Sequence, residues 1–369
     1  MPIKYLRNLS ENSLRGKKVL VRVDFNVKSA IDSLRLERTV PTIKFLLKNG
    51  ATPVLISHRG RPKPGARIVG RDETLRVAVP FLTKALRRKI YFFPSLNLEI
   101  LKEKINNAPR ESVILLENLR LLPGEEADDP ILGRKLASLA HIYVNDAFAV
   151  NHRKNASVTQ IPKHLKSYAG LLLEDELREL GNLSKSPKRP FVIILGGAKA
   201  SDKIGIIERF LPYATHILLG GVPANTFLKA RGFDIDKSPY EPSMLERAKK
   251  LLQSEKIILP KDFVSFQGKI LDIGKESAEL FKHYIKGART ILWNGPLGLF
   301  EDPRFAKGSE TIARAIASGR GYSIVGGGET TALILKLNLE KWVSFLSTGG
   351  GAMLEYLADK KLPGIEALK

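Results

Sequence analysis

The sequence predicts an α/β protein with mainly parallel sheets covered by helices. Three observations support this class. Short apolar runs recur along the whole chain, each run is followed by polar or glycine-rich residues, and helix-length amphipathic stretches separate the runs. The runs are continuously apolar rather than alternating, and strands of that kind are buried on both faces, as in parallel sheets. This number of strands indicates two sheets.

The predicted strands and helices can be placed directly in the sequence. In the first half the strand runs are "KVLVRVDFN", "TPVLISHRGR", "SVILLENLR" and "HIYVNDAF". In the second half they are "FVIILGGAK", "HILLGGV", "KIILPKD", "TILWNGP", "YSIVGGGET" and "SFLSTGGGA". Amphipathic stretches such as "TVPTIKFLLKNG" and "PSMLERAKKLLQSE" predict helices between them.

Two domains are expected, because 369 residues with 43% hydrophobic content can bury two cores. A helical pattern begins at Ala169 and reaches the Ser-, Pro- and Lys-rich stretch at 184–190. We interpret 169–183 as a connecting helix between a first domain at 1–170 and a second at 171–355.

Composition excludes several kinds of site. The chain has no cysteine, so disulfides, thiolate metal sites and cysteine nucleophiles are impossible. The N-terminal stretch lacks the apolar core of a signal peptide, and no run of about 18 apolar residues predicts a membrane span. We therefore expect a cytoplasmic protein.

The net charge is +22 and it is uneven. Residues 1–170 contain 31 basic and 15 acidic residues, whereas residues 171–369 contain 29 and 23. A basic first half attracts anions, which at this point leaves phosphorylated small molecules, nucleic acid and anionic membrane surfaces open.

Four glycine clusters follow strands of the second half: Gly196–Gly197, Gly220–Gly221, Gly326–Gly328 and Gly349–Gly351. In "LGGAKASDKIG", a strand–turn–helix would direct backbone N–H groups and two lysines at one place. A single such turn is equally well a solvated connection, but four at one sheet edge predict a polyphosphate site. Glu329 then either stabilises a helix N-terminus or binds Mg²⁺ beside the phosphates.

Polar side chains of a different kind follow the strands of the first half. They are Arg22, Asp24, Asn26, His58, Arg59, Arg61, Arg120, Asn145, Asp146, His152 and Arg153. Any one of them is more often a surface or capping residue. Several arginines at one edge, however, repel one another unless an anion binds, which predicts a small phosphorylated acid as ligand. A zinc site at the two histidines is disfavoured because no third ligand is near in sequence.

Ten segments, in this order, give the chain a resemblance to phosphoglycerate kinase along nearly its whole length: "RVDFNV", "SHRGRP", "LLENLR", "YVNDAF", "GGAKASDKI", "LPKD", "WNGPLGLFE", "GGGET", "STGGGA" and "LPGIEAL". The resemblance implies two Rossmann-like domains joined by a hinge. The first would hold 3-phosphoglycerate or 1,3-bisphosphoglycerate and the second Mg-ADP or Mg-ATP, with the tail at 356–369 returning to the first domain.

The resemblance also assigns roles to residues. The acid substrate would contact Asp24, Asn26, Arg35, His58, Arg61, Arg120 and Arg153. The nucleotide would contact Gly197, Lys199, Lys203, Gly221, Asn294, Pro296, Glu301, Gly326, Gly327, Gly328, Glu329 and Thr330. Arg35, Lys199 and Gly328 would be catalytic, and Glu329 would bind Mg²⁺. Other expected properties are a monomer, domain closure, and no membrane or specific nucleic-acid partner.

The chain departs from the family's pattern at a few positions. Glu329 replaces the usual aspartate at the metal position, and the loop before Arg35 is shorter than usual. The other departures are Lys28 for proline, Ala149 and Val150 for Gly-Thr, Asn155 for histidine and Val222 for glycine. They concern the geometry of the acid site and the base pocket rather than the reaction.

Two other classes compete with a kinase. A nucleic-acid binder would explain the charge, but it needs a basic stripe with interleaved aromatics, and the 7% aromatic residues lie mostly in apolar runs. An inactive relative would keep the fold, yet Arg35, Lys199 and the metal carboxylate are all present. Both considerations favour the kinase.

Overall fold

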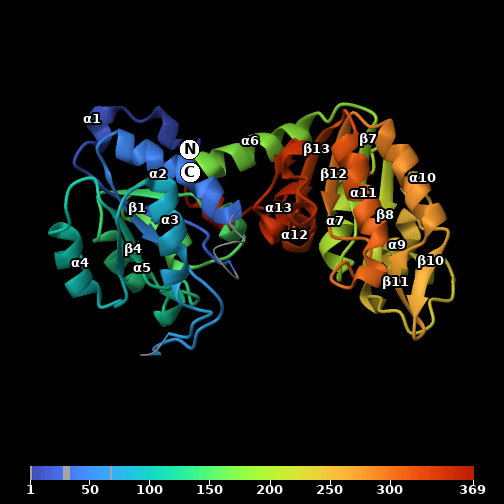
Figure 1. Cartoon of the computed structure of the whole chain (residues 1–369), viewed down its shortest axis with the longest axis horizontal. Helices are drawn as coiled ribbons and strands as arrows, with labels where there is room; N and C mark the ends of the chain where they lie inside the picture. The colour runs from blue at the N-terminus through green and yellow to red at the C-terminus, as the bar shows by residue number, and fades with distance from the viewer. Residues whose placement is uncertain (1, 28–33, 67–68) are drawn as a thin grey trace. The chain divides into compact units, whose positions relative to one another are not determined.

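A computed structural model describes residues 2–27, 34–66 and 69–369, and the chain in it divides into two compact units. Unit 1 comprises Met1–Arg178 and Lys361–Lys369, and unit 2 comprises Glu179–Lys360 (Figure 1). The division falls inside helix α6 (Leu171–Lys185). The binding roles expected for the two domains stay predictions, and Lys28 lies outside the described residues.

Unit 1 is built on a six-stranded sheet in the order β3-β4-β2-β1-β5-β6. Its strands are β1 (Lys18–Arg22), β2 (Thr52–Ile56), β3 (Ile90–Phe93), β4 (Val113–Leu116), β5 (Ile142–Asn145) and β6 (Lys166–Ala169). Its helices are α1 (Glu11–Leu14), α2 (Leu34–Lys48), α3 (Val79–Leu86), α4 (Leu98–Asn106), α5 (Pro130–Ala137) and α14 (Pro363–Glu366). All described strand pairs of this sheet are parallel.

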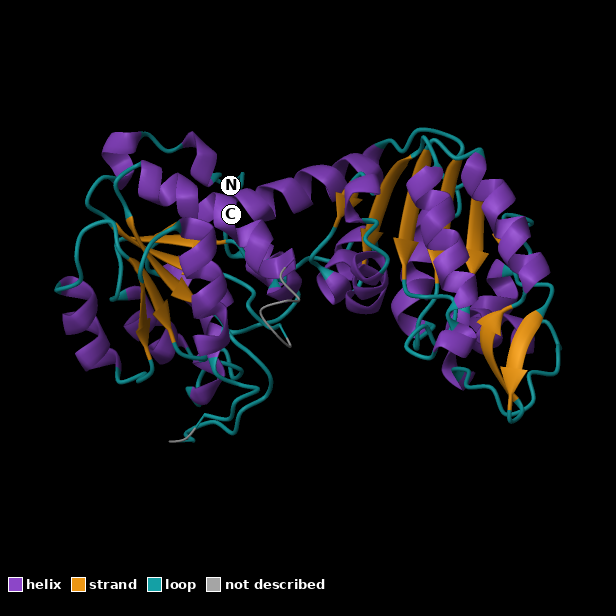
Figure 2. Cartoon of the chain, viewed as in Figure 1, coloured by secondary structure: helices purple, strands orange, loops and turns teal. Residues whose placement is uncertain are grey.

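Unit 2 has a second six-stranded parallel sheet in the order β14-β13-β12-β7-β8-β9. Its strands are β7 (Phe191–Leu195), β8 (His216–Leu219), β9 (Ile257–Ile258), β12 (Thr290–Asn294), β13 (Tyr322–Gly326) and β14 (Phe345–Leu346). Its helices are α7 (Ser201–Phe210), α8 (Gly221–Ala230), α9 (Leu245–Leu251), α10 (Lys275–Lys286), α11 (Lys307–Ser318), α12 (Gly328–Lys336) and α13 (Gly350–Leu357). An antiparallel hairpin of β10 (Phe263–Phe266) and β11 (Lys269–Ile273) lies beside it (Figure 2).

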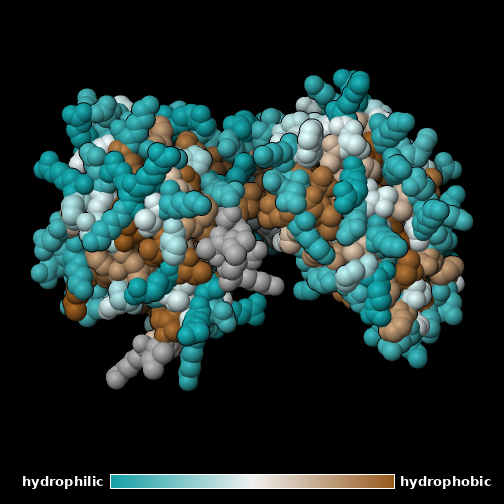
Figure 3. Space-filling view, viewed as in Figure 1, coloured by the Kyte–Doolittle hydropathy of each residue, from teal (hydrophilic) through white to brown (hydrophobic). Residues whose placement is uncertain are grey.

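The α/β class predicted from the sequence is confirmed. Central strands such as β2, β7 and β12 are buried along their whole length, which explains their continuously apolar sequences. Helices flank the strands of each unit (Figure 2), and the visible surface is mainly hydrophilic (Figure 3). No helix in the described part of the chain is both long and apolar enough to cross a membrane.

The connecting helix begins on a buried carboxylate. Asp146, two positions beyond Val144 in β5, is fully buried, and its Oδ1 accepts hydrogen bonds from the Leu172 amide at 2.9 Å and the Leu173 amide at 3.4 Å. Burial raises the pKa of Asp146 to about 7, although these hydrogen bonds oppose the rise. The first turn of α6 is thereby tied to the carboxyl edge of the unit 1 sheet.

Glycines allow two turns of unit 2 to pack closely at the carboxyl edge of its sheet. The Gly196 amide donates to the Asn294 carbonyl at 3.0 Å, and the Gly197 amide donates to the Pro296 carbonyl at 2.8 Å. A Cβ added at Gly196 would lie 2.0 Å from the Pro296 oxygen. Because that oxygen belongs to backbone, any side chain at 196 has to separate the two turns.

We expect Gly196→Ala to destabilise unit 2 by about 1–3 kcal/mol, the usual cost of overpacking. Both tryptophans, Trp293 and Trp342, belong to unit 2, so urea unfolding followed by tryptophan fluorescence reports on that unit. Gly287→Ala is the matched control, since nothing lies within 4 Å of a Cβ added there. Equal unfolding midpoints for the two variants would contradict the close approach at Gly196.

Candidate functional sites

In unit 1, the predicted acid-site residues occupy loops at the carboxyl edge of the sheet. Asp24 and Asn26 follow β1, and His58 and Arg61 follow β2. Arg35 is in the first turn of α2, Arg120 is in the 3₁₀ turn Leu119–Leu121, and Arg153 lies eight residues after Asn145, the last residue of β5. In a parallel sheet these loops lie on one edge, which is the usual position of a ligand site.

Hydrogen bonds link several of these residues. Arg35 Nη1 lies 2.9 Å from Asp24 Oδ2 and donates to the Asn26 carbonyl at 3.1 Å. Asn26 Oδ1 accepts from the Gly60 amide at 3.0 Å, and the Gly60 carbonyl accepts from Arg120 Nη1 at 2.6 Å. The loops after β1, β2 and β4 are therefore joined through their site residues.

The charges of four arginines act on His58. Burial is the main reason that the pKa of His58 lies well below its usual value, and the charges of Arg22, Arg120, Arg153 and Arg35 lower it further. Burial lowers the pKa of Arg120; Glu126 opposes this shift, and the charges of Arg153, Arg22 and Arg61 add to it. His58 is thus a neutral imidazole among cations near pH 7, and the surroundings favour an anionic ligand.

Two arginines of this edge support the site rather than line it. Arg22 is 1% exposed, and its guanidinium donates to Ser157 Oγ at 2.9 Å and lies 3.2 Å from His58 Nδ1. Ser157 Oγ donates to the buried Glu125 at 2.6 Å, which gives the Arg22 charge a nearby carboxylate. Arg59 is 3% exposed and donates to the Val27 carbonyl at 2.7 Å. Sequence position alone does not distinguish these two from Arg35 or Arg120.

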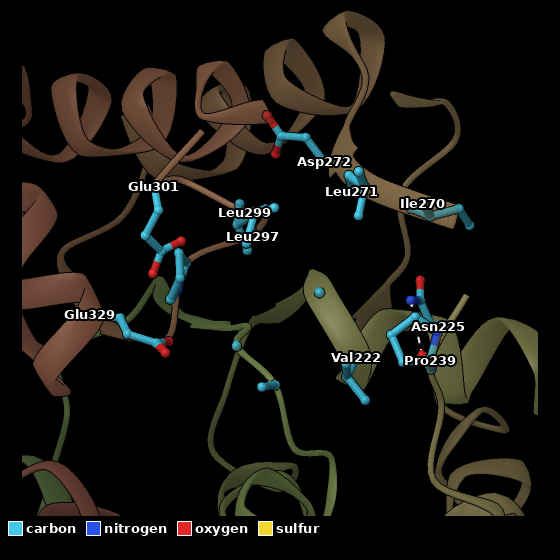
Figure 4. A pocket seen from close by; sticks show the side chains of 15 residues that line it. Val222, Asn225, Pro239, Ile270, Leu271, Asp272, Leu297, Leu299, Glu301 and Glu329 are labelled. Carbon is cyan, nitrogen blue, oxygen red and sulfur yellow. Dashed lines mark hydrogen bonds between the residues drawn. The ribbon is translucent and has the colours of Figure 1, made fainter. Parts of the chain in front are cut away.

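In unit 2, a pocket of about 200 Å³ lies at the carboxyl edge of the sheet (Figure 4). The predicted residues that line it are Gly197, Gly221, Pro296, Glu301 and Glu329. Sequence reasoning missed Asn225, Pro239, Ile270, Leu271, Asp272 and Leu299, which also line it. Ile270–Asp272 belong to β11, whose hairpin was not predicted. One end of the pocket is therefore apolar and the other carries glycine turns and carboxylates.

The other predicted residues of unit 2 stand next to this pocket without lining it. Lys203 is 6% exposed and donates through Nζ to Asn294 Oδ1. Asn294 Nδ2 donates to the Gly326 carbonyl at 2.9 Å, and Thr330 Oγ1 accepts from the Gly295 amide at 2.7 Å. These contacts join β12 to the turn before α12. Gly327 has a φ of 99°, a backbone conformation that favours glycine at this turn.

Lys199 and Gly328 are both exposed, and no atom lies within 4 Å of a Cβ added at Gly328. Lys199 lies in the turn between β7 and α7, and Gly328 is the first residue of α12. Two backbone amides of "LGGAKASDKIG" already have a partner within the protein. The Ala200 and Ser201 amides donate to the Glu241 carboxylate at 3.0 and 2.9 Å, so a side chain already occupies this part of the α7 N-terminus.

Carboxylates are the candidate metal ligands in the unit 2 pocket. In the described part of the chain no three His, Asp or Glu side chains gather into a metal site. Glu329 and Glu301 line the same pocket, and the Glu329 charge acts on Lys203. A single carboxylate of this kind suits Mg²⁺, which commonly takes its remaining ligands from water and substrate phosphates.

Two parallel α/β units, one with converging arginines and one with a glycine-turn pocket, define a class of phosphate-handling enzyme. Comparison with known proteins gives the family: the phosphoglycerate kinase family model matches residues 9–360. The chain belongs to the phosphoglycerate kinase family.

Individual relatives agree with the family match. Phosphoglycerate kinase of Thermosipho africanus is 42% identical, covering 96% of both chains, and that of Dictyoglomus turgidum is 41% identical, covering 100% of both. The crystal structure of phosphoglycerate kinase from Pyrococcus horikoshii superposes with a TM-score of 0.87 at 30% identity, covering 99% of this chain and 98% of that one. The structure from Coxiella burnetii gives 0.83 at 32%, covering 100% and 99%.

We expect the Lys203 amine to titrate far below an ordinary lysine. Burial lowers its pKa to about 8, while Asp202 and Glu329 partly oppose the shift. The amine is therefore a cation below pH 8 and neutral above it, and affinity for ADP should fall as pH rises through 8. Side-chain NMR of labelled lysines, with Lys203→Arg to assign the signal, measures the titration. A midpoint near 10, as in free lysine, would contradict it.

Proposed function

We propose that the two candidate sites carry out the reaction of this family, the reversible transfer of a phosphoryl group between 1,3-bisphosphoglycerate and ADP to give 3-phosphoglycerate and ATP. The chain is accordingly a phosphotransferase with a carboxyl acceptor, acting in glycolysis. The observation that carries the proposal is the pairing of an arginine-rich edge in unit 1 with a glycine-turn pocket in unit 2. A coupled assay with 3-phosphoglycerate and Mg-ATP tests it directly.

The acid substrate would bind in unit 1 to Asp24, Asn26, Arg35, His58, Arg61, Arg120 and Arg153. The convergence of four arginine charges on His58 supports this, since a phosphorylated carboxylate supplies the missing negative charge. The neutral imidazole adds a hydrogen-bonding group without further repulsion. Fixing Arg120 and Asn26 through Gly60 holds the cations in place before the ligand arrives.

The nucleotide would bind in unit 2. Its base would lie against the apolar end of the pocket, formed by Val222, Leu271 and Leu299, and its phosphates against Gly197, Gly221 and the turn before α12. Lys199 and Lys203 would meet the phosphate charge, while Asn294 holds Lys203. Glu329 would hold Mg²⁺ together with the nucleotide phosphates, and the ion would neutralise phosphate charge there.

This chemistry needs alignment more than proton transfer. A carboxylate and a diphosphate oxygen are both ionised at pH 7, so neither direction of the reaction requires a general base. Arg35 from unit 1 and Lys199 from unit 2 would neutralise the oxygens of the transferring group, and the Gly328 amide would donate to it. The reaction then depends on bringing these groups together without water.

Bringing them together requires domain closure, which we include in the proposal. Helix α6 supports it because the helix starts in unit 1, on Asp146, and ends in unit 2. Closure about such a connection would assemble the catalytic groups only when both substrates are bound. The proposal further takes the protein to act as a monomer in the cytoplasm without a specific nucleic-acid partner.

We expect Arg35→Ala and Lys199→Ala each to reduce kcat by more than about tenfold, with much smaller changes in KM, because both cations interact most strongly with the transition state. Steady-state kinetics measures the split. Arg15→Ala and Lys282→Ala serve as controls, since both side chains are exposed and pair with neighbours on their own helix or its cap. A variant that keeps more than about a tenth of kcat lacks the assigned role.

Val222 should relax selection of the base. Its side chain lines the apolar end of the pocket, where the family has glycine, and an apolar misfit changes binding by about 1–3 kcal/mol. We expect GDP to be used with a kcat/KM within about tenfold of that for ADP, and Val222→Gly to increase the preference for ADP. The ADP-to-GDP ratio is its own control, because lost stability affects both nucleotides alike. An unchanged ratio would remove Val222 from base selection.

A further inference from the structure

The turn that carries Lys199 is held from outside by one carboxylate. Glu241, which precedes the 3₁₀ turn Pro242–Met244, places Oε1 at 3.0 Å from the Ala200 amide and Oε2 at 2.9 Å from the Ser201 amide. These are the residues at which the Lys199 turn becomes helix α7. Each carboxylate oxygen thus accepts one hydrogen bond, and the negative charge of Glu241 strengthens both bonds.

Pro239, two residues before Glu241, belongs to the wall of the pocket (Figure 4). Pro239 and Asn225 line the pocket, and Asn225 Nδ2 donates to the Pro239 carbonyl at 3.1 Å. The Glu241 amide donates to Thr226 Oγ1 at 3.1 Å, and that hydroxyl donates to the Val222 carbonyl at 2.9 Å. Two successive hydrogen bonds through Thr226 therefore link the Glu241 backbone to Val222, which lines the pocket.

A second connection closes a ring. The Val222 amide donates to the Gly197 carbonyl at 3.0 Å, at the start of the turn that Glu241 holds at its end. The start of the Lys199 turn is consequently hydrogen-bonded to α8, and its end is hydrogen-bonded to Glu241, two residues after Pro239. A base that presses on Val222, Asn225 or Pro239 acts on elements hydrogen-bonded directly to this turn.

A carboxylate is the side chain that this position requires. Two backbone amides need two acceptor oxygens, whereas glutamine supplies one oxygen and would present its NH₂ group to the other amide. The N-terminus of α7 also carries partial positive charge, which favours an anion. With Glu241 in place, a substrate phosphate cannot bind these two amides in a wrong position.

We propose that Glu241 is a positioning residue for phosphoryl transfer, which fixes the turn carrying Lys199 and couples its placement to occupancy of the base pocket. The inference rests on the catalytic role proposed above for Lys199. Glu241 contacts no reacting atom in this scheme. Its loss should leave the pocket able to bind nucleotide and should impair the alignment needed in the transition state.

Steady-state kinetics of Glu241→Ala and Glu241→Gln test the role. We expect Glu241→Ala to lower kcat by about tenfold or more with the KM for ADP within about threefold of wild type, and Glu241→Gln to be intermediate because it keeps one acceptor. Glu208→Gln is the matched control, since Glu208 lies near the other end of α7 and pairs with Arg247 on the surface. An unchanged kcat, or a loss confined to KM, would overturn the proposal.

A double-mutant cycle with Lys199→Ala separates positioning from a general structural effect. If Glu241 acts through Lys199, removing Glu241 from the Lys199→Ala protein costs little further kcat. If the kcat losses of the two single variants multiply in the double variant, Glu241 and Lys199 act independently and the proposal is overturned. If Glu241→Ala does not fold, Glu241→Gln takes its place in the cycle. An inactive wild type would refute the proposed function itself, whereas an active wild type with an unaffected Glu241 variant refutes this inference alone.

Discussion

The arrangement of unit 2 depends on direct backbone contact between the turn after β7 and the turn after β12. The hydrogen bonds of Gly196 and Gly197 to Asn294 and Pro296 set the separation of these turns, and only glycine allows it. From that contact follow the position of Asn294, hence of Lys203, and the floor against which α8 begins at Gly221. A phosphate site made of backbone and buried lysine requires this closeness, because longer side chains would fill the space for the ligand.

Unit 1 meets a different constraint, the repulsion between like charges. Arg22 is buried with hydrogen bonds to Ser157 and a contact with His58, and Glu125 supplies a carboxylate behind Ser157. Arg35 is paired with Asp24. The charges of Arg120 and Arg153 also act on His58, which is neutral and adds no further positive charge. The sheet edge therefore keeps a positive potential that attracts an anion. In the proposed function the two units would bind phosphate by different means, mainly through arginines in unit 1 and through glycine-turn backbone with lysines in unit 2.

The sequence predicted the features that local pattern determines. Central strands were identified because burial on both faces leaves only apolar residues, and the strand ends located most of the residues that the structure places at the carboxyl edges of the two sheets. Strands β3 and β6 at the sheet edges, and the β10–β11 hairpin, were missed. Polar residues interrupt the apolar run in β6, β10 and β11, whereas β3 is a short apolar run, "IYFF", that was not assigned to a strand. Glu241 was missed because its hydrogen-bond partners lie some 40 residues away, and nothing in "SPYEPSM" marks a helix cap. Arg22 supports the edge from inside, whereas Arg35 is a proposed site residue. This difference likewise depends on burial, which a strand-end position does not reveal.

The hairpin that supplies Ile270 and Leu271 to the pocket has wider meaning for how such an enzyme changes over evolutionary time. At the proposed phosphate end of the pocket, a Cβ added at Gly196 or Gly221 would lie within 3 Å of the backbone of a neighbouring turn. The base end rests on a peripheral two-stranded element with an exposed outer face, including Phe266 and Val264. Over evolutionary time, substitutions in this hairpin would therefore alter the proposed contacts with the base without placing a side chain against the glycine turns.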